Sequence, residues 1–191
     1  MEITALSLDL ALTHAGMSLL HIPIKTGLIK PSEVKISKIK LVKTERKTTK
    51  GIYQNSDDLR RLSEIVAEIR EMQSHADVVF AEIPSGAQNA RAATTFGAVL
   101  GILSTLEKPL IQVQKNDRGM VVAGRKVVSK TEVIDWAHNN WPNLDWETTK
   151  RNGSKVLTLA NEHVADSIAV AFAGMQKEQW QNLAKTLLIG R

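Results

Sequence analysis

The sequence predicts an α/β protein built on a mixed sheet, in which three antiparallel strands are followed by parallel strands and helices cover both faces. Two observations support this fold class. The chain opens with three segments of strand character, then alternates helical and strand segments, and ends in helices. Residues 77–82 are almost wholly apolar, which is typical of strands buried on both faces in the middle of a parallel or mixed sheet.

The first three strands are expected before residue 45. Residues 3–10 form an apolar run that predicts a buried strand, a turn is expected over 11–15, and a second strand over 16–24. The next segment is basic and shows a partial alternation of apolar side chains, which predicts a third strand beside the first two. These apolar side chains are Val34, Ile36, Ile39 and Leu41.

Helical periodicity begins after this segment. Residues 57–74 carry apolar side chains at spacings of three and four, so they predict a helix with one apolar face, and Asn55 and Ser56 are candidate caps. The residues expected on that face are Leu59, Leu62, Ile65, Val66, Ile69 and Met72. The acidic residue Glu82 ends the strand predicted over 77–82.

The second half of the chain predicts helices around one more strand. A helix is expected over 87–106, with the run 96–103 buried and with Gly97 and Gly101 allowing close helix packing, and a strand is expected over 110–114. The sequence from Ser129 to Glu132 is a capping box that predicts a helix up to residue 139. Two further helices are expected, one from about residue 161 and one over 178–188.

Composition and length predict one domain over residues 1–191. The 191 residues suffice for a sizeable core, and no linker-like stretch divides them. The chain has no cysteine, which excludes disulfides and cysteine-based zinc sites. It also lacks an apolar run of roughly 18 residues, the length of a membrane helix, and has no basic, apolar start of the signal-peptide kind. We therefore expect a cytoplasmic protein.

Positive charge is concentrated in one segment. The net charge is +5, yet residues 25–50 hold nine basic and two acidic residues, a local +7 that leaves −2 for the rest of the chain. A phosphate-binding surface has such local charge, which makes Lys35, Lys38, Lys40, Lys43 and Lys47 candidate DNA contacts. An equally weighted alternative is that these lysines protect the edge of the sheet from aggregation.

Three acids and a histidine stand where the predicted elements would gather carboxylates. Asp9 lies near the end of the first strand among apolar neighbours, where a carboxylate is costly unless it is paired or bound to a metal. His163 and Asp166 are three residues apart, so both project from one face of a helix. Two metal ions about 4 Å apart, held mainly by carboxylates, support phosphodiester cleavage. Each feature alone also fits an ordinary surface residue, but together they predict a catalytic metal site of Asp9, Glu82, His163 and Asp166.

The ordered motifs of the chain resemble the RuvC-type Holliday-junction resolvases of the RNase H-like superfamily. The sequence from Asn161 to Ala171 is similar to the last active-site helix of that family, and the sequence from Phe80 to Asn89 resembles its second acidic strand and the loop that follows. Residues 118–133 resemble the basic stretch before the last active-site helix, and Asp9 with Gly16 matches the first strand and its hairpin. The resemblance covers about residues 3–175.

The resemblance implies a crossover junction endodeoxyribonuclease that acts as a homodimer on branched DNA such as four-way junctions. Mg²⁺ would be the cofactor, with Mn²⁺ able to substitute. Asp9 would bridge two metals, Glu82 and Asp166 would each bind one, and His163 would bind a metal or orient its water. The dimer contact is expected on the helix over 87–106. The basic residues expected beside or near the scissile phosphate are Arg118, Lys130, Lys115, Arg125 and Lys126.

The chain departs from the family pattern at three places. The family often has Pro-Gly shortly after the first acid, where this chain has Leu-Ala-Leu-Thr over 10–13. The loop after the second acid often carries an aromatic wedge, where this chain has Pro84, Ser85 and Gly86. The basic segment is also longer than in the family. Such divergence is more typical of phage or organellar relatives, and a phage-encoded protein would act in the host cytoplasm.

Other functions fit part of the pattern. A nuclease of the same fold that cuts another branched or flapped DNA would share every site residue. A catalytically silent protein that binds branched DNA is disfavoured, because all four ligand positions carry competent side chains. An ATP-binding protein of the actin-like fold would need Gly-rich phosphate loops after its first acid, and none is present there.

Overall fold

The computed structural model describes residues 1–48 and 50–189, and it confirms the predicted fold class. A five-stranded sheet has the order β3-β2-β1-β4-β5, in which β1, β2 and β3 are antiparallel neighbours while β4 and β5 run parallel to β1. The strands are β1 (Glu2–Leu10), β2 (His14–Pro23), β3 (Lys35–Lys43), β4 (Val78–Glu82) and β5 (Leu110–Val113). Because β1 and β4 are parallel neighbours, Asp9 and Glu82 come to the same edge of the sheet.

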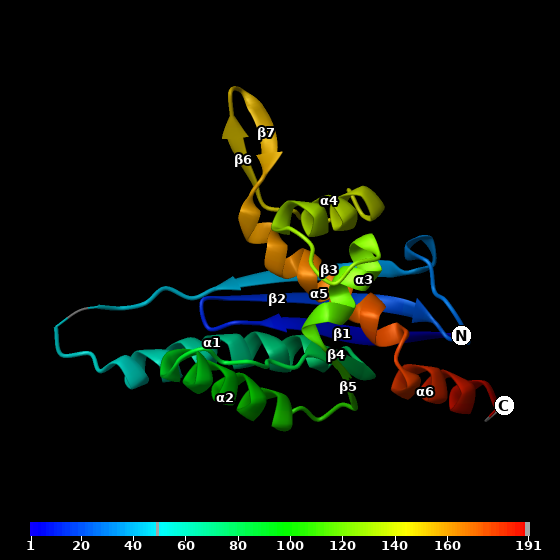
Figure 1. The fold of residues 1–191 in the computed structure, drawn as a ribbon, viewed down its shortest axis with the longest axis horizontal. Helices are drawn as coiled ribbons and strands as arrows, with labels where there is room; N and C mark the ends of the chain where they lie inside the picture. The colour runs from blue at the N-terminus through cyan, green and yellow to red at the C-terminus, as the bar shows by residue number, and fades with distance from the viewer. Residues whose placement is uncertain (49, 190–191) are drawn as a thin grey trace.

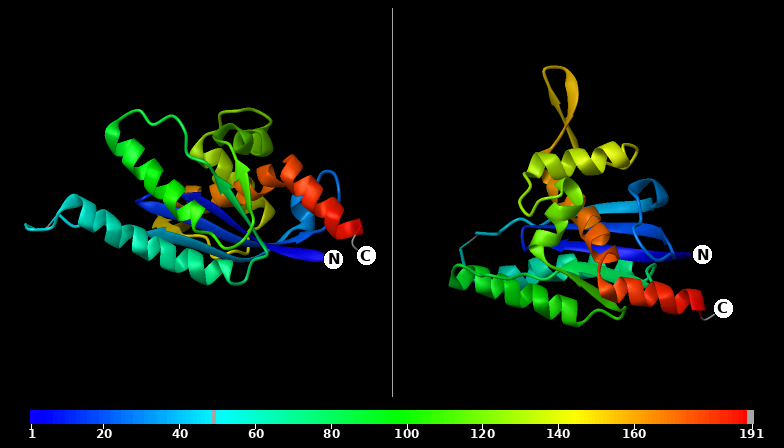
Figure 2. Two further views of the ribbon diagram at one scale, coloured as in Figure 1. Left: turned by 90° about the horizontal axis from the view of Figure 1, so that it is seen from below. Right: turned by 45° about the vertical axis from the view of Figure 1, so that its right-hand side comes forward.

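Helices cover both faces of the sheet (Figures 1 and 2). On one face lie α1 (Gln54–Gln73) and α2 (Ala90–Ser104); the other face carries α3 (Lys115–Ala123), α4 (Lys130–Asn140) and α5 (Glu162–Met175), and the chain continues into α6 (Glu178–Ile189). The helix α5 packs directly on β1 and β2. Across residues 1–48 and 50–189, no helix is long and apolar enough to cross a membrane.

Alternation along β1 divides the core into two layers. Ile3 and Ala5 pack in the cluster on the α5 side, whereas Leu6 and Leu8 pack in the cluster on the α1 side. Successive side chains of a strand point to opposite faces, so Asp9 falls on the α5 side. That helix is mostly apolar after its first turn, and every residue over 164–175 is buried, Asp166 and Ser167 included. The strand therefore brings one carboxylate directly under the most buried helix of the protein.

The helix α1 differs from its prediction at its start. It begins at Gln54 with Tyr53 as the N-cap, so the predicted caps Asn55 and Ser56 are wrong and lie inside the helix. Leu59, expected on the apolar face, is 66% exposed. The first turns instead bury polar groups that pair with one another: Arg61 and Arg91 both contact the carboxylate of Asp58. Apolar packing starts one turn later, at Ile65, Ile69 and Met72.

The apolar run 96–103 was expected to be buried, and this prediction is wrong for most of α2. Only Val99 and Leu103 are buried, since α2 covers an outer part of the sheet with one side only. A Cβ atom on Gly97 or Gly101 would meet nothing within 4 Å. Close packing at these glycines therefore does not occur within the described chain, and an apolar face of α2 is left exposed.

Two elements are not predicted by the sequence. Residues 115–123 form the helix α3, and β6 (Thr148–Arg151) pairs with β7 (Ser154–Leu157) as a separate hairpin. Short 3₁₀ turns also occur at η1 (Pro31–Glu33) and η2 (Leu159–Asn161). The predicted capping box is confirmed, because Ser129 accepts a hydrogen bond from the backbone N–H of Glu132 and the side chain of Glu132 accepts one from the N–H of Ser129.

Candidate active site

Asp9 and His163 meet where the first turn of α5 lies on β1 and β2. The Nδ1 atom of His163 is 2.9 Å from Oδ2 of Asp9. Gly16 makes this approach possible: it pairs with Asp9 in the β1–β2 ladder, and a Cβ atom on it would lie 1.8 Å from the carbonyl oxygen of His163. The backbones of β2 and α5 therefore touch at Gly16, and this contact fixes the distance between the histidine and the acid.

Asp166 lies one helical turn further along α5. Its residue is 4% exposed, and its Oδ2 atom forms an ion pair with the guanidinium of Arg118 from α3. Burial, reinforced by the negative charge of Asp9, raises the pKa of Asp166 to about 8 despite the opposing effect of Arg118. Such a carboxylate is costly to ionise and gains much from an added positive charge.

Glu82 stands at the end of β4, beside β1. Burial raises the pKa of its carboxyl above the ordinary value, and the negative charge of Asp9 adds to the shift, while Arg118 opposes it. A small cavity of about 140 Å³ is lined by Asp9, Glu82 and Lys115, together with Leu10, Pro84, Ser85 and Phe96. The two strand-end acids therefore border one small, partly open cavity.

Unpaired oxygen atoms mark this place as suited to a cation. Within the described part of the chain, Oε2 of Glu82 and Oδ1 of Asp166 are buried without a hydrogen-bond partner. Buried oxygen atoms of this kind are rare unless an ion or water satisfies them. No three acidic or histidine side chains among the described residues are arranged as a ready ligand cage. Arg118 partly neutralises the acids in this arrangement, since it contacts Asp166 and opposes the rise in the pKa of Glu82.

Two residues of the site were not predicted. His14 opens β2 and stacks on His163 with ring centroids 5.1 Å apart; burial lowers its pKa, and the charge of His163 adds to this effect. Glu162 precedes His163 and forms an ion pair with Lys130, whose Nζ atom is 2.6 Å from Oε2 of Glu162. His14 follows a turn and shows no periodicity that distinguishes it, whereas Glu162, directly before His163, could have been included as a candidate.

The basic residues predicted to bind near the scissile phosphate divide into two groups. Lys115 borders the cavity of Asp9 and Glu82, Arg118 pairs with Asp166, and Lys130 pairs with Glu162 beside His163. Arg125 and Lys126 lie in the exposed turn after α3, where Arg125 pairs with Glu132. The structure thus brings the first three to the acidic residues and leaves the other two further along the surface.

The lysines of the basic segment also differ in their surroundings. Lys38 and Lys40 pair with acids of α1, at 3.0 Å from Glu71 and 3.2 Å from Glu68. Lys43 pairs with Glu147 in the loop before β6, at the end of β3 that is nearest His14. Lys35 and Lys47 are exposed. Of this segment, Lys43 is therefore tied to the neighbourhood of the candidate site, while Lys38 and Lys40 help to hold the edge strand on α1.

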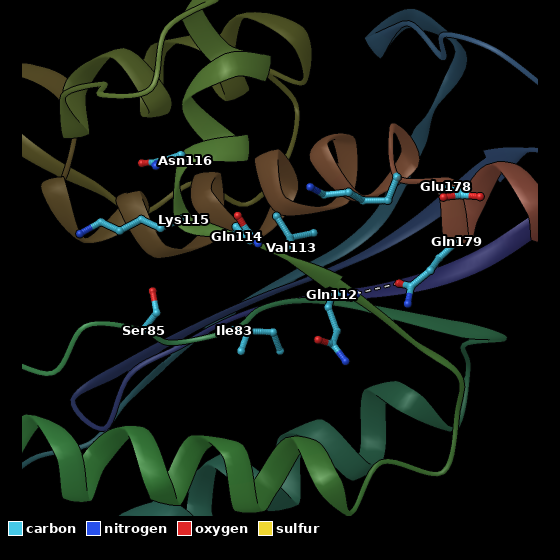
Figure 3. Close-up of a pocket in the computed structure, with 10 residues that line it drawn as sticks. Ile83, Ser85, Gln112, Val113, Gln114, Lys115, Asn116, Glu178 and Gln179 are labelled. Carbon is cyan, nitrogen blue, oxygen red and sulfur yellow. Dashed lines mark hydrogen bonds between the residues drawn. The ribbon is translucent and has the colours of Figure 1, made fainter.

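A second cavity of about 600 Å³ adjoins the acidic site and shares Lys115 and Ser85 with it. Figure 3 shows that its walls come from the end of β5, the start of α3 and the start of α6, and that Gln112 and Gln179 approach each other there. The Oε1 atom of Gln179 accepts a hydrogen bond of 3.4 Å from the backbone N–H of Gln112. The amide side chains here offer both donors and acceptors beside the acids.

Comparison with solved structures identifies the class of fold. The chain is similar to Thermus thermophilus RuvC in complex with a Holliday-junction substrate, with a TM-score of 0.57 and 18% identity over 90% of this chain and 92% of the other. Thermus thermophilus RuvC is also matched in a second structure, with a TM-score of 0.55, 18% identity and the same coverage of both chains. Neither a protein-family model nor a curated protein sequence matches the chain.

A third similar structure is the Fowlpox virus resolvase in complex with a substrate Holliday junction, with a TM-score of 0.53 and 11% identity over 97% of this chain and 99% of the other. The chain therefore has the RNase H-like fold of the RuvC-like Holliday-junction resolvases. This agrees with the resemblance found in the sequence.

Proposed function

We propose that this protein is a metal-dependent endonuclease that binds branched DNA and hydrolyses its phosphodiester bonds, with four-way junctions as the preferred substrate. One observation carries the proposal. Asp9, Glu82 and Asp166 come from three separate elements to one partly buried place, where two of their oxygen atoms lack partners among the described residues. Burying three carboxylates close together costs free energy, and bound cations would offset this cost.

The donor set fits a hard divalent cation. Carboxylate oxygens suit Mg²⁺ and Mn²⁺, and imidazole suits Mn²⁺ as well. Asp9, Glu82 and Asp166 would hold the cations, and His163 would bind one of them or orient Asp9 through its 2.9 Å contact. When bound, the cations supply positive charge that activates a water and stabilises the leaving oxygen. Lys115 and Lys130 would hold the phosphate beside the acids, and Arg118 would be released from Asp166 to join them.

The choice of branched DNA is supported by the fold and by the charge. The three similar structures are resolvases, and two of them are complexes with Holliday junctions. Positive charge lies near the acids at the Lys43 end of β3 and on the segment from α3 to the start of α4. Cationic residues at such places supply phosphate contacts without reading sequence.

The substrate is tested by cleavage of defined DNA structures. Purified protein with Mg²⁺ should cut a synthetic four-way junction at least tenfold faster than a flap or a linear duplex of the same sequence. Faster cleavage of the flap would support the nuclease activity but would make flapped DNA, not the four-way junction, the preferred substrate. If the protein binds the junction but cuts none of the three in Mg²⁺ or Mn²⁺, it is a silent branched-DNA-binding protein.

We further propose that the protein is a homodimer through α2. The outward face of this helix is apolar and built of small residues, and Leu100 at its centre is 46% exposed. A two-fold dimer would place two active sites on opposing strands of a junction. The residues of this face are Ala93, Gly97, Leu100, Gly101 and Ser104.

Leu100→Glu should convert the dimer to a monomer, because it places a charge in the centre of the apolar contact. Light scattering at micromolar concentration should give twice the chain mass for the wild type and the chain mass for the variant. Leu188→Glu is the matched control, since Leu188 is 42% exposed on α6 and should leave the mass unchanged. A monomeric wild type, with or without DNA, would contradict the dimer.

A further inference from the structure

The hairpin of β6 and β7 projects from the body of the protein beside the amino-terminal end of α5 (Figures 1 and 2). Its turn is formed by Asn152 and Gly153, with φ values of 49° and 80°. Both values are positive, as the tight turns of two-residue hairpins require. Strands of four residues at about 3.3 Å each make a ribbon roughly 13 Å long.

This ribbon adds nothing to the core. Every residue over 148–156 is exposed. A two-stranded hairpin without a covered face is marginally stable in water, so the energy that holds it must come from its base. Folding therefore does not explain why the protein carries the ribbon.

The base of the ribbon is held firmly. Asn161, 2% exposed, accepts a hydrogen bond of 2.9 Å from the N–H of Glu147 and donates one of 2.8 Å to its carbonyl oxygen. The backbone N–H of Thr158 donates a further bond to Glu147, and Trp146 is buried in the core. Since Asn161 is the residue before α5, the direction of the ribbon is fixed relative to His163 and Asp166.

The charges of the ribbon point to an anionic partner. Residues 148–157 contain Lys150, Arg151 and Lys155 and no acidic residue. Lys150 is directly opposite Lys155 in the ladder, so the two ammonium groups lie on the same face. Like charges at such positions destabilise a hairpin. Within residues 1–48 and 50–189 none of these three cations takes part in an ion pair.

We propose that the β6–β7 hairpin is a DNA-binding arm that holds the phosphate backbone of a duplex next to the candidate active site. A phosphate between Lys150 and Lys155 would turn their repulsion into attraction, and the major groove of B-DNA admits a two-stranded ribbon. The ion pair between Lys43 and Glu147 joins the base of the arm to the basic end of β3. The proposal rests on the proposed function, since it assumes that branched DNA is bound, and it adds a contact to a duplex arm of that DNA.

The test compares two variants of equal charge. Lys150→Gln with Lys155→Gln removes the opposed pair, and Lys108→Gln with Lys185→Gln removes two cations from the loop before β5 and from α6. Binding of a labelled four-way junction is measured without divalent cations over a range of salt concentrations. Two lost phosphate contacts should reduce the slope of log K against log salt by about 1.8 for the hairpin variant, and the control should keep the wild-type slope. The unfolding temperature of the hairpin variant should not fall, because a repulsion is relieved.

Shortening the duplex arms of the junction gives a second measurement. The difference between the wild type and the hairpin variant should disappear once the arms are too short to reach the ribbon. The proposal that the hairpin binds DNA would be contradicted if the wild type and the hairpin variant had equal salt slopes. It would also be contradicted if the hairpin variant and the control variant lost equal amounts of slope. Failure of the wild-type protein to bind junctions at all would overturn the proposed function instead. A changed mass in light scattering with unchanged DNA binding would make the hairpin a protein contact and also overturn the arm.

Discussion

Glu82→Gln should reduce junction cleavage by about a hundred- to a thousandfold while leaving junction affinity within about twofold of the wild type. Losses of this size follow when one electrostatic contribution to a transition state is removed. Affinity is retained because phosphate contacts come from lysine and arginine side chains. Single-turnover cleavage and binding without metal measure the two effects separately. Asp9→Asn and Asp166→Asn should reduce cleavage equally, and normal cutting by any two of the three variants would refute the proposed site.

Glu82→Gln should at the same time stabilise the metal-free protein. The pKa of Glu82 is raised by burial, and that of Asp166 is raised to about 8, so the folded protein holds protons that the unfolded chain has released. Stability contributed by these groups is present below the unfolded pKa of roughly 4 and is lost as pH rises towards 8. The unfolding temperature of the metal-free wild type should therefore fall over this range, and that of the glutamine variant should fall less. An identical pH dependence would show that Glu82 does not carry the buried charge.

Asp166→Asn provides an informative contrast. It also removes a buried titratable group, but wherever Asp166 is ionised it leaves the guanidinium of Arg118, which is 17% exposed, without its carboxylate partner. Removing one member of a buried pair is destabilising. We therefore expect a lower unfolding temperature for Asp166→Asn than for Glu82→Gln in the absence of metal. Mg²⁺ should raise the unfolding temperature of the wild type, because a ligand that binds only the folded state shifts the folding equilibrium. The rise should be smaller in both variants than in the wild type.

The sheet could be predicted because its strands carry their information locally. The apolar runs around Ala5 and Phe80 indicate buried strands, and the acids at their ends mark the edge where parallel neighbours meet. The spacing of His163 and Asp166 likewise indicates one helix face, provided that a helix forms. These features depend on residues that are close in sequence, so the main elements of the fold and the four candidate site residues follow from them.

Features that depend on distant contacts were not predictable in the same way. The pairing of Arg118 with Asp166 joins α3 to α5, and the stacking of His14 on His163 joins β2 to α5. The sequence does not predict the helix α3, because its basic residues and Gly119 hide its short apolar face. The apolar composition of α2 indicated burial, yet composition does not say how many neighbours a helix has.

The hairpin of β6 and β7 is a different case, because its signal was present. Asn152-Gly153 is flanked by residues of strand character, and this dipeptide is among the strongest local hairpin signals. The charged residues around the turn gave no apolar alternation, so the segment showed no buried face. A strand whose residues are all exposed has no periodicity to detect, and only the turn chemistry predicts it.

Gly16→Ala should damage both folding and cleavage, because the new methyl group has no space. Its Cβ atom would lie 1.8 Å from the carbonyl oxygen and 2.1 Å from the carbonyl carbon of His163, which are backbone atoms that cannot rotate away. The start of α5 must then move away from β2, and His163 and Asp166 must move with it. Overpacking of this kind typically costs about 1–3 kcal/mol or more, and a displacement of about 1 Å in an active site can cost about a hundredfold in rate.

The matched control is Ser63→Ala, at an exposed position of α1 outside the candidate active site and outside the proposed dimer face. Alanine has the higher helix propensity, so this variant should be at least as stable as the wild type. Urea unfolding should therefore show a loss of stability for Gly16→Ala alone, and single-turnover cleavage should be slowed in Gly16→Ala and unchanged in the control. A soluble Gly16→Ala protein that cuts junctions at the wild-type rate would show that the contact between β2 and α5 does not position the site. A variant that still binds junctions but cuts them slowly, with a weakened response of its unfolding temperature to Mg²⁺, would show that this contact sets the geometry of the metal ligands.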